Sequence, residues 1–355
     1  MINLEKHLSI NPYSLDIESK NKFFSKQMAK LIKYHFKKCK EYKNILTNLN
    51  YDLDNCITSR MPYIPVTLFK ELELLSVPKK KIIKTLVSSG TTGNRKSIIH
   101  LDNNNSKNQI KILSKLFSQI IGKNRLPMLI IDSKSIFKDR NLFSARVAAI
   151  NGFSFNAKDI TYVLDDDLNI KINELEKFFI NNKNKKIIIF GFTYLLWNYF
   201  YKALINKNKE YDLSNCIIIH GGGWKKLQNE SVNNSFLKSS FNKNFKISNI
   251  YNYYGMVEQS GSIFFECKEG YYHTSIFSDI LIRNNNLNLS KLDEEGIIEL
   301  FSLLPSSYPG HIILTQDKGK IVGIDNCKCG KLGKYFEVNG RLLDSETRGC
   351  SDTIT

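Results

Sequence analysis

A glycine-rich segment with hydroxyl and basic side chains is the first part of the sequence that could bind a charged ligand. It consists of Ser88, Ser89, Gly90, Thr91, Thr92 and Gly93, and Lys96 follows it. Its glycines let the backbone approach a ligand closely, and exposed amides can hold an anion. The hydroxyl groups and the ammonium of Lys96 add donors suited to a polyphosphate. The segment therefore predicts a phosphate-binding loop, although an ordinary Gly/Ser/Thr turn has the same composition.

The P-loop of nucleoside triphosphatases is the nearest alternative for this segment. That pattern needs a glycine, four residues, a second glycine, a lysine and then serine or threonine. Counted from Gly90, Arg95 stands at the second glycine position. Its side chain would obstruct the wrapping of backbone around a phosphate, so we disfavour a P-loop.

Two later segments carry chemistry that suits the same ligand. Three consecutive glycines follow a short apolar run, namely Gly221, Gly222 and Gly223. Backbone without side chains can lie against a flat purine, although a plain tight turn has the same requirement. Further on, Tyr254 and Gly255 precede Glu258. A carboxylate is a hard oxygen ligand of the kind that binds Mg²⁺ beside phosphates, but in sequence a solvated surface acid looks the same.

The cysteines offer two other kinds of chemistry. Cys327 and Cys329 flank one residue and could be half of a zinc site, but a structural zinc site needs about four ligands. Without a clear second pair, a tight β-turn explains this segment as well. Cys350 lies close to the end of the sequence beside Arg348 and Gly349. A mobile arm there could present a thiolate as a nucleophile, and an inert terminal cysteine is the alternative.

Strand and helix patterns alternate around these motifs. Short β-branched runs predict strands at 82–87, 128–131, 187–190 and 217–220. Helical periodicity predicts helices near 106–121, 173–181, 193–205 and 229–239. Beyond Tyr271 the patterns predict strands without helices, at 280–282, 297–303, 312–314 and 321–324. We therefore expect a mostly parallel sheet covered by helices, with ligand loops at the carboxyl ends of its strands, followed by a β-rich subdomain.

The N-terminal part has a different pattern. Apolar residues recur at helical spacing from Ser19 to Leu49, which predicts one long amphipathic helix with His35 and Cys39 facing the core. Prolines at 62 and 65 then break the pattern.

Composition limits the class of protein. A chain of 355 residues with 42% hydrophobic content can bury a large core and favours one large domain with small additions. We find neither a signal peptide nor the roughly 20 apolar residues that span a bilayer, and the scattered cysteines predict a reduced, cytoplasmic setting. The net charge of +17 could attract nucleic acid or a membrane surface. Because the lysines are dispersed and no nucleic-acid motif is present, we favour a solvated surface and expect no specific nucleic-acid partner.

Together the motifs resemble those of the adenylate-forming superfamily, which includes acyl-CoA synthetases, luciferases and the adenylation domains of peptide synthetases. Its loop reads Ser/Thr-Ser-Gly-Ser/Thr-Thr-Gly, any residue, Pro, Lys; here Arg95 replaces the proline and Lys96 is kept. The segment from Tyr254 to Glu258 resembles Tyr-Gly-x-Thr-Glu, with a valine in place of the threonine. Thr315-Gln316-Asp317 resembles Thr-Gly-Asp, and Gly340-Arg341-Leu342-Leu343-Asp344 resembles Gly-Arg-x-x-Asp. The matches keep the family order from Ser88 to Asp344.

The resemblance implies ATP and Mg²⁺ as cofactors and a role for each motif. The glycine-rich loop would grip the β- and γ-phosphates. Tyr254 would lie against the adenine, and Glu258 would help to hold Mg²⁺. Asp317 would accept hydrogen bonds from the ribose hydroxyls, Arg341 would neutralise the α-phosphate or contact the ribose side, and Asp344 would sit at a domain hinge.

Further segments are similar to the acyl-protein synthetases of bacterial fatty-acid reductase systems, with the phenylacetate–CoA ligases as related neighbours. These segments are 61–70, 190–193, 220–225 and 346–350. The resemblance implies an adenylation domain over 1–340, made of a helical segment (1–80), an α/β region with the nucleotide motifs (81–270) and a β-rich subdomain (271–340). A hinge and short arm would follow over 341–355. Family members continue past the hinge into a mobile domain with a catalytic lysine, and no position here can be assigned that lysine. We therefore expect a truncated C-terminal domain, with Lys96 as one source of the missing positive charge.

The implied function is activation of a carboxylic acid, in this family a fatty acid, to an acyl-adenylate, followed by transfer to a cysteine thiol. Cys350 would carry the acyl group as a thioester and pass it to a partner such as a reductase. Delivery to coenzyme A, a carrier protein or an amine stays open. So does a binding module that has kept the fold without the activity.

Overall fold

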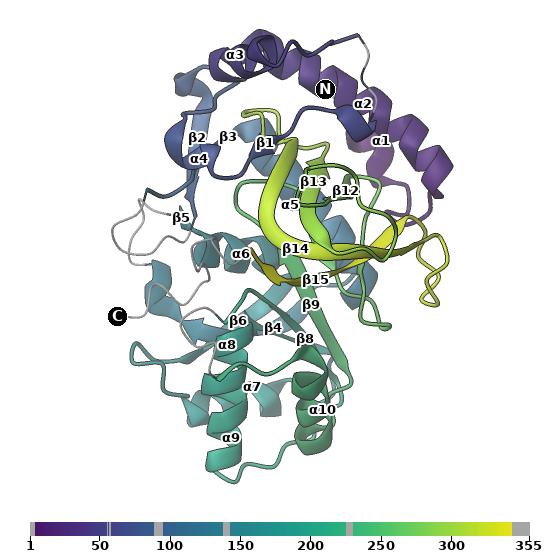
Figure 1. Cartoon of the computed structure of the whole chain (residues 1–355). Helices are drawn as coiled ribbons and strands as arrows, with labels where there is room; N and C mark the ends of the chain where they lie inside the picture. Colours follow the sequence, from purple (N-terminus) through teal and green to yellow (C-terminus); the bar gives the residue numbers. More distant parts are fainter. Residues whose placement is uncertain are drawn as a thin grey trace. The chain divides into compact units, whose positions relative to one another are not determined.

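The computed structural model describes residues 4–54, 56, 58–88, 95–137, 143–224 and 230–342. Contacts between Cα atoms divide the chain into two compact units. The first unit contains the described residues up to Ser88, those of 95–115 and those of 255–342; the second contains the described residues of 116–254. Figure 1 shows an antiparallel sheet in the first unit and a helix-covered sheet in the second.

The second unit is built on parallel strands, as the alternating pattern predicted. In the order in which they pair, the strands are β9 (Asn249–Gly255), β8 (Cys216–Gly221), β7 (Ile187–Phe192), β4 (Leu126–Ser133) and β6 (Ala157–Leu164). Each neighbouring pair is parallel. All residues of β7 and β8 are buried, which is why these strands appear in sequence as continuous apolar runs.

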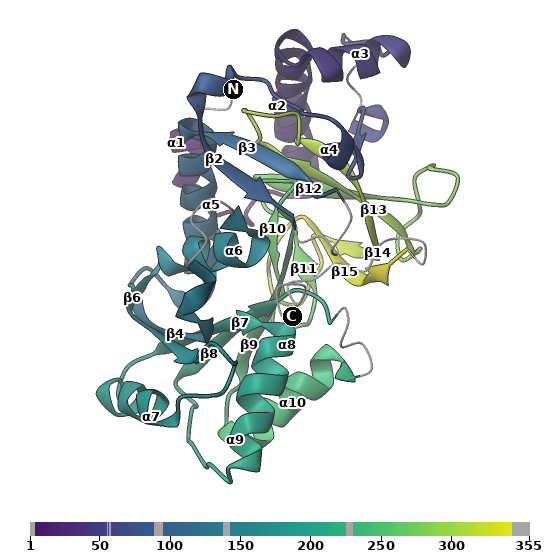
Figure 2. The same cartoon turned by 90° about the vertical axis from the view of Figure 1, so that its left-hand side faces the viewer.

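Helices of the second unit pack beside these strands (Figure 2). They are α6 (Ala145–Ser154), α7 (Ile172–Asn181), α8 (Thr193–Leu195), the π-helical turn η4 (Leu196–Tyr201), α9 (Lys202–Asn206) and α10 (Asn234–Phe245). The helix predicted over 193–205 is therefore present but is interrupted by the π turn. The helix predicted from 229 begins later, because Asn233 caps α10 and its side-chain oxygen accepts from the amide of Phe236 at 2.7 Å. The short elements η3 (Lys134–Phe137) and β5 (Phe143–Ser144) complete this unit.

The first unit is organised around an antiparallel sheet. Its strands pair in the order β11 (Tyr272–His273), β15 (Lys334–Arg341), β14 (Ile312–Ile324), β13 (Gly296–Ser302) and β12 (Ser278–Arg283), with β1 (Ile64–Pro65) parallel to β14. Two separate strands were predicted where β14 runs unbroken. The apolar runs at its two ends are joined by a polar stretch that contains Gly319, where the register shifts and an added Cβ would lie 2.2 Å from the carbonyl oxygen of Glu337. A glycine bulge therefore lets one strand change its pattern midway.

A hairpin and several short elements accompany this sheet. The hairpin is β2 (Ile82–Val87) with β3 (Ile98–Asp102), and α5 (Asn103–Ile121) follows it. The short elements are α1 (Leu4–Leu8), η1 (Thr58–Arg60), α4 (Leu68–Glu71), η2 (Lys79–Lys81) and β10 (Ile263–Phe265).

The long N-terminal helix predicted from the sequence is two helices. These are α2 (Ile17–Lys38) and α3 (Lys40–Asn48), and they meet at Cys39, whose backbone is extended with φ −110° and ψ 115°. Cys39 and His35 are both buried, 1% and 0% exposed, and each of the two helices has buried apolar residues of its own, such as Met28 and Leu46. The predicted core position of these two side chains is confirmed. Among the helices of the described residues, none is long and apolar enough to cross a membrane.

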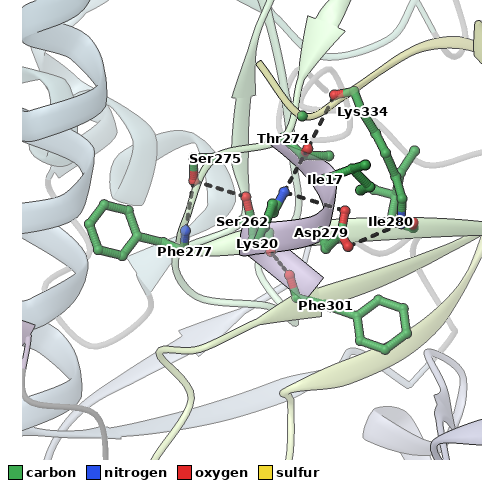
Figure 3. A network of polar contacts seen from close by, with 12 residues as sticks. Ile17, Lys20, Ser262, Thr274, Ser275, Phe277, Asp279, Ile280, Phe301 and Lys334 are labelled. Carbon is green, nitrogen blue, oxygen red and sulfur yellow. Dashed lines mark hydrogen bonds and ion pairs between the residues drawn. The ribbon is translucent and has the colours of Figure 1, made fainter. Parts of the chain in front are cut away.

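A buried ionic network ties α2 to the antiparallel sheet (Figure 3). The ammonium of Lys20 donates to Thr274 Oγ1 at 2.7 Å and lies 3.4 Å from Asp279 Oδ1. Lys334 Nζ donates to Asp279 Oδ2 at 3.0 Å and to the carbonyl of Ile280 at 2.8 Å. Burial lowers the pKa of Lys20 to about 8 against the attraction of Asp279. Although burial opposes its ionisation, the two ammonium groups hold the pKa of Asp279 below its ordinary value.

Candidate functional site

The ends of the glycine-rich loop are held together by a hairpin. Ser88 follows β2, and its amide donates to the carbonyl oxygen of Ser97 at 3.0 Å. In return Ser88 Oγ accepts from the amide of Ser97 at 3.0 Å, so the two residues clamp the base of the loop. Lys96 is exposed beside this clamp. Residues 89–93, which include the predicted phosphate-binding glycines, lie outside the described residues.

The predicted purine contact lies at the carboxyl ends of β8 and β9. Gly221 closes β8 and pairs in register with Tyr253 of β9. A Cβ added at Gly221 would lie 2.6 Å from Tyr253 Cε1, so this position admits only glycine without a displacement of the tyrosine ring. Gly222 has φ +82°, a conformation that favours glycine, whereas an added Cβ at Gly223 would meet nothing within 4 Å.

The ring of Tyr253 also packs against two other aromatic rings. Its centroid lies 5.1 Å from that of Phe153 and 6.2 Å from that of Phe190, and the two phenylalanines are 1% and 0% exposed. Tyr254 follows directly on β9 and is half-buried. The sequence motif singled out Tyr254 but missed Tyr253, whose interlocking with Gly221 depends on strand pairing that a motif does not contain.

Thr193 and His220 support the end of β8. The hydroxyl of Thr193 donates to the carbonyl of Gly221 at 3.2 Å and lies 3.0 Å from His220 Nδ1. Burial lowers the pKa of His220 to about 3, so the imidazole is neutral near pH 7. These contacts fix the strand end that presents the three glycines.

Glu258 is buried in the first unit, with an exposure of 3%, so it is not a solvated surface acid. The two residues that follow it are held by hydrogen bonds. Gln259 Nε2 donates to the carbonyls of Leu300 at 3.0 Å and Gly310 at 3.1 Å. The amide of Ser260 donates to the hydroxyl of Tyr308 at 2.9 Å. Burial raises the pKa of Tyr308 to about 12, and the nearby Glu258 carboxylate contributes to this rise.

Asp317 and Arg341, predicted from two separate motifs, are brought together by strand pairing. They lie opposite each other on β14 and β15, and Arg341 Nε donates to Asp317 Oδ1 at 2.9 Å. The amide of Asp317 donates to Thr315 Oγ1 at 3.0 Å, which fixes the backbone of the Thr-x-Asp segment. The aspartate is 8% exposed and the arginine half-buried, so the pair lies at the margin of the sheet.

The predicted site residues thus fall on both units. Ser88, Lys96, Glu258, Asp317 and Arg341 belong to the first unit, as does Gly255, which begins its last segment. The three glycines of 221–223 and Tyr254 belong to the second unit. Asp344 and Cys350 lie outside the described residues. Within each unit, residues distant in sequence are brought to one strand end or one strand pair.

Solved structures of known proteins share this fold. The 2-hydroxyisobutyryl-CoA ligase in an open conformation, solved with 2-HIB-AMP and CoA, aligns with a TM-score of 0.72 at 11% identity, over 94% of this chain and 77% of that one. The amide bond synthetase McbA from Marinactinospora thermotolerans aligns with a TM-score of 0.50 at 12% identity, over 84% of this chain and 55% of that one. At such low identity the likeness shows the fold alone, and that fold is the one of adenylate-forming ligases.

The family is shown by sequence. The model of the LuxE acyl-protein synthetases matches residues 4–355, and the chain therefore belongs to this family. A curated relative is the long-chain-fatty-acid–luciferin-component ligase of Aliivibrio fischeri, 25% identical over 360 residues, which are 96% of this chain and 90% of that protein.

Proposed function

We propose that this protein activates a fatty acid with ATP to an acyl-adenylate and transfers the acyl group to a cysteine thiol. Membership of the LuxE family over residues 4–355 is the observation that carries the proposal. The relative in Aliivibrio fischeri, a long-chain-fatty-acid ligase by name, favours a long acyl chain.

In the first half-reaction a carboxylate oxygen of the acid attacks the α-phosphorus of ATP, and pyrophosphate leaves. The task of the protein is alignment and charge neutralisation. The exposed ammonium of Lys96 and the guanidinium of Arg341 are the cations assigned to the phosphates. The Asp317 carboxylate, already bonded to Arg341, is assigned to the ribose hydroxyls, and this bond fixes the direction of both side chains.

The adenine is assigned to the glycines at the end of β8 and to Tyr254. The ring of Tyr253 fills the space beside Gly221, so the bare backbone that we assign to a planar base is that of Gly222 and Gly223, which are exposed. The neutral, buried His220 and Thr193 hold this strand end in place.

Glu258 fits the chemistry of a Mg²⁺ ligand, because it is a buried carboxylate on a braced loop. Bound there, Mg²⁺ would supply positive charge to the phosphates of ATP.

In the second half-reaction a thiolate sulfur attacks the acyl carbonyl carbon. A thioester forms, the bond from the carbonyl carbon to the phosphate oxygen breaks, and AMP leaves. We assign this thiol to Cys350. From the thioester the acyl group would pass to a partner of the fatty-acid reductase kind.

The decisive experiment measures isotope exchange between pyrophosphate and ATP with fatty acids of increasing length. Wild type should exchange, and Lys96→Ala and Glu258→Gln should each lower the rate by about 10²–10³, the usual effect of removing one preorganised charge contact. Glutamine keeps the volume of the buried side chain, so the fold should survive the second change. A binding module without activity would show no exchange with any acid, which would refute the proposal.

The acceptor is tested with radiolabelled acid and ATP. Wild type should hold a hydroxylamine-sensitive label, and Cys350→Ser should form the adenylate but hold none. Cys56→Ser is the matched control and should be labelled like wild type, since Cys56 lies in the first unit and belongs to none of the motifs. A label retained by Cys350→Ser would assign the acyl group to another thiol, and release of label only on addition of coenzyme A or an amine would identify a different ligase.

A further inference from the structure

Four side chains that share no sequence motif converge in the first unit. They are Cys267, His273, Cys327 and Cys329, and one ligand atom of each lies within 4.8 Å of the others. Cys267 Sγ is 4.0 Å from Cys327 Sγ, and Cys329 Sγ is 3.3 Å from His273 Nε2. We propose that these side chains bind a zinc ion in a structural Cys₃His site.

The distances match the geometry of such a site. Zinc binds thiolate sulfur at about 2.3 Å and imidazole nitrogen at about 2.0 Å, so in a tetrahedral site two sulfur atoms stand about 3.8 Å apart and sulfur and nitrogen about 3.5 Å apart. The S–S distance of 4.0 Å and the S–N distance of 3.3 Å lie close to these values, and the remaining separations need a contraction of at most about 1.3 Å. Three thiolates and one imidazole are also the donor set that favours zinc over Mg²⁺ or Ca²⁺.

Two similar turns present the sulfur atoms. In the turn from Cys267 to Gly270 the amide of the glycine donates to the carbonyl of the cysteine at 3.0 Å, and the glycine has φ +89°. The turn from Cys327 to Gly330 has the same bond at 3.0 Å and a glycine with φ +82°. The left-handed glycine closes each turn tightly, so both turns hold a cysteine at the same point. His273 completes the set from β11, next to the first turn.

The surroundings suit a charged metal–thiolate group. Cys267, His273 and Cys327 are buried and Cys329 is half-buried, so the ion would be enclosed on most sides. Three thiolates and Zn²⁺ leave one negative charge. Lys331 follows the second turn, and its ammonium, which interacts with all three cysteines, also lies 4.4 Å above the ring of Tyr13. A cation directed at this cluster is favourable when the sulfur atoms are ionised.

The site would join two connections of the first unit, and the N-terminal segment packs beside them. Cys327 and Cys329 lie in the connection between β14 and β15, and Cys267 lies in the connection between β10 and β11. The N-terminal segment packs on both, because the carbonyl of Tyr13 accepts from the amide of Leu332 at 3.1 Å and its ring lies edge-on to His273 at 6.2 Å. Thr274, adjacent to His273, accepts from the buried Lys20 in the network of Figure 3. Zinc would therefore fasten the segment from Cys267 to His273 to the turn of the β14–β15 hairpin, and the N-terminal segment packs on both.

The test is metal analysis of the full chain, purified without a polyhistidine tag and passed through metal-free buffer. Wild type and Cys56→Ser should each contain close to one zinc per chain. Cys267→Ser and Cys327→Ser should each lose zinc, with an affinity lower by more than about tenfold. Titration of wild type with an organomercurial should release zinc in step with thiol modification, which makes the result independent of whether the serine variants fold.

Cobalt gives a second, spectroscopic measurement. Wild type stripped by a chelator and refilled with Co²⁺ should show thiolate-to-cobalt charge-transfer absorption and the intense visible bands of a tetrahedral ion, and Cys56→Ser should show the same spectrum. Limited proteolysis should cut the stripped protein within 9–16 or 325–333 and spare the zinc form. Wild type without stoichiometric metal and without the cobalt spectrum would overturn the proposal, as would a Cys267–Cys327 disulfide in the native protein or iron in place of zinc.

Discussion

The contact between Gly221 and Tyr253 allows a sharp test of the proposed nucleotide site. In Gly221→Ala the new Cβ would lie 2.6 Å from Cε1 and 2.8 Å from Cδ1 and Cζ of Tyr253. Carbon atoms in contact stand about 3.5–4.0 Å apart, so the ring must retreat by about 1 Å. The ring has little free space around it, because the buried rings of Phe153 and Phe190 already pack against it with centroids 5.1 and 6.2 Å away. The end of β9, with Tyr254, must then move instead.

Two losses follow from this displacement. Overpacking costs about 1–3 kcal/mol, so Gly221→Ala should be measurably less stable in urea unfolding. A misplacement of about 1 Å at a reactive site can cost about 10² in rate, or about 2.7 kcal/mol of activation free energy, so pyrophosphate–ATP exchange should fall by about that factor. Both measurements are made on the same protein at a temperature well below its unfolding transition.

Matched variants separate the clash from the effect of an added methyl group. Gly223→Ala should unfold like wild type, because its Cβ meets nothing within 4 Å. Phe153→Leu in the Gly221→Ala background should recover part of both losses, since it opens room behind the ring of Tyr253. Wild-type exchange and stability in Gly221→Ala, or equal destabilisation by Gly223→Ala, would refute the packing argument.

Two further predictions concern buried ionisable groups of the first unit. Asp279→Ala leaves the buried Lys20 without its counter-ion, so it should lower the free energy of unfolding by about 3–5 kcal/mol in urea titrations, and a loss below about 1 kcal/mol would contradict the ionic network. Burial lowers the pKa of His35 to about 3 in the folded state, so below pH 6.5 only the unfolded state binds the proton. The free energy of unfolding is therefore unaffected by this histidine above about pH 6.5 and decreases as the pH falls toward 3. The decrease amounts to about 2 kcal/mol at pH 5. His35→Gln should therefore show a smaller loss of stability between pH 7.5 and pH 5 than wild type, and equal losses would exclude the histidine as a cause.

Much of the parallel sheet could be predicted because its strands are buried on both faces. The run at 187–190 is apolar throughout, the run at 217–220 is apolar except for the buried His220, and they lie within β7 and β8. The antiparallel sheet was harder to predict. In β14 the polar residues from Gln316 to Lys320 lie between two apolar runs, and only pairing with both β13 and β15 makes the whole segment one strand. The break at Cys39 was missed for a related reason, since the apolar spacing continues through it while the backbone does not.

In the candidate site, too, local motifs predicted single residues, whereas contacts between distant residues decide their surroundings. Short motifs predicted Glu258, Asp317 and Arg341 but not their environment. Burial of Glu258 depends on Gln259 reaching Leu300 and Gly310, which are about 40–50 residues further along the chain. Chemistry that depends on contacts between distant residues has no local spacing by which a sequence could reveal it.

The β14–β15 hairpin carries residues of both the proposed nucleotide site and the proposed zinc site. Near its open end, Asp317 and Arg341 form the ion pair that we assign to ATP, and its turn carries Cys327 and Cys329. The middle of this hairpin is polar and carries a glycine bulge. Pairing of β11 with β15, the buried contact of Lys334 with Asp279 and the proposed zinc site all act near the turn, and each restrains the strand that ends at Arg341. The pairing of β14 with β15 continues from the turn to Asp317 and Arg341 through two register shifts, so a restraint at the turn also acts on which residues face each other at the open end. The metal would then act on the nucleotide residues through strand register, without touching substrate.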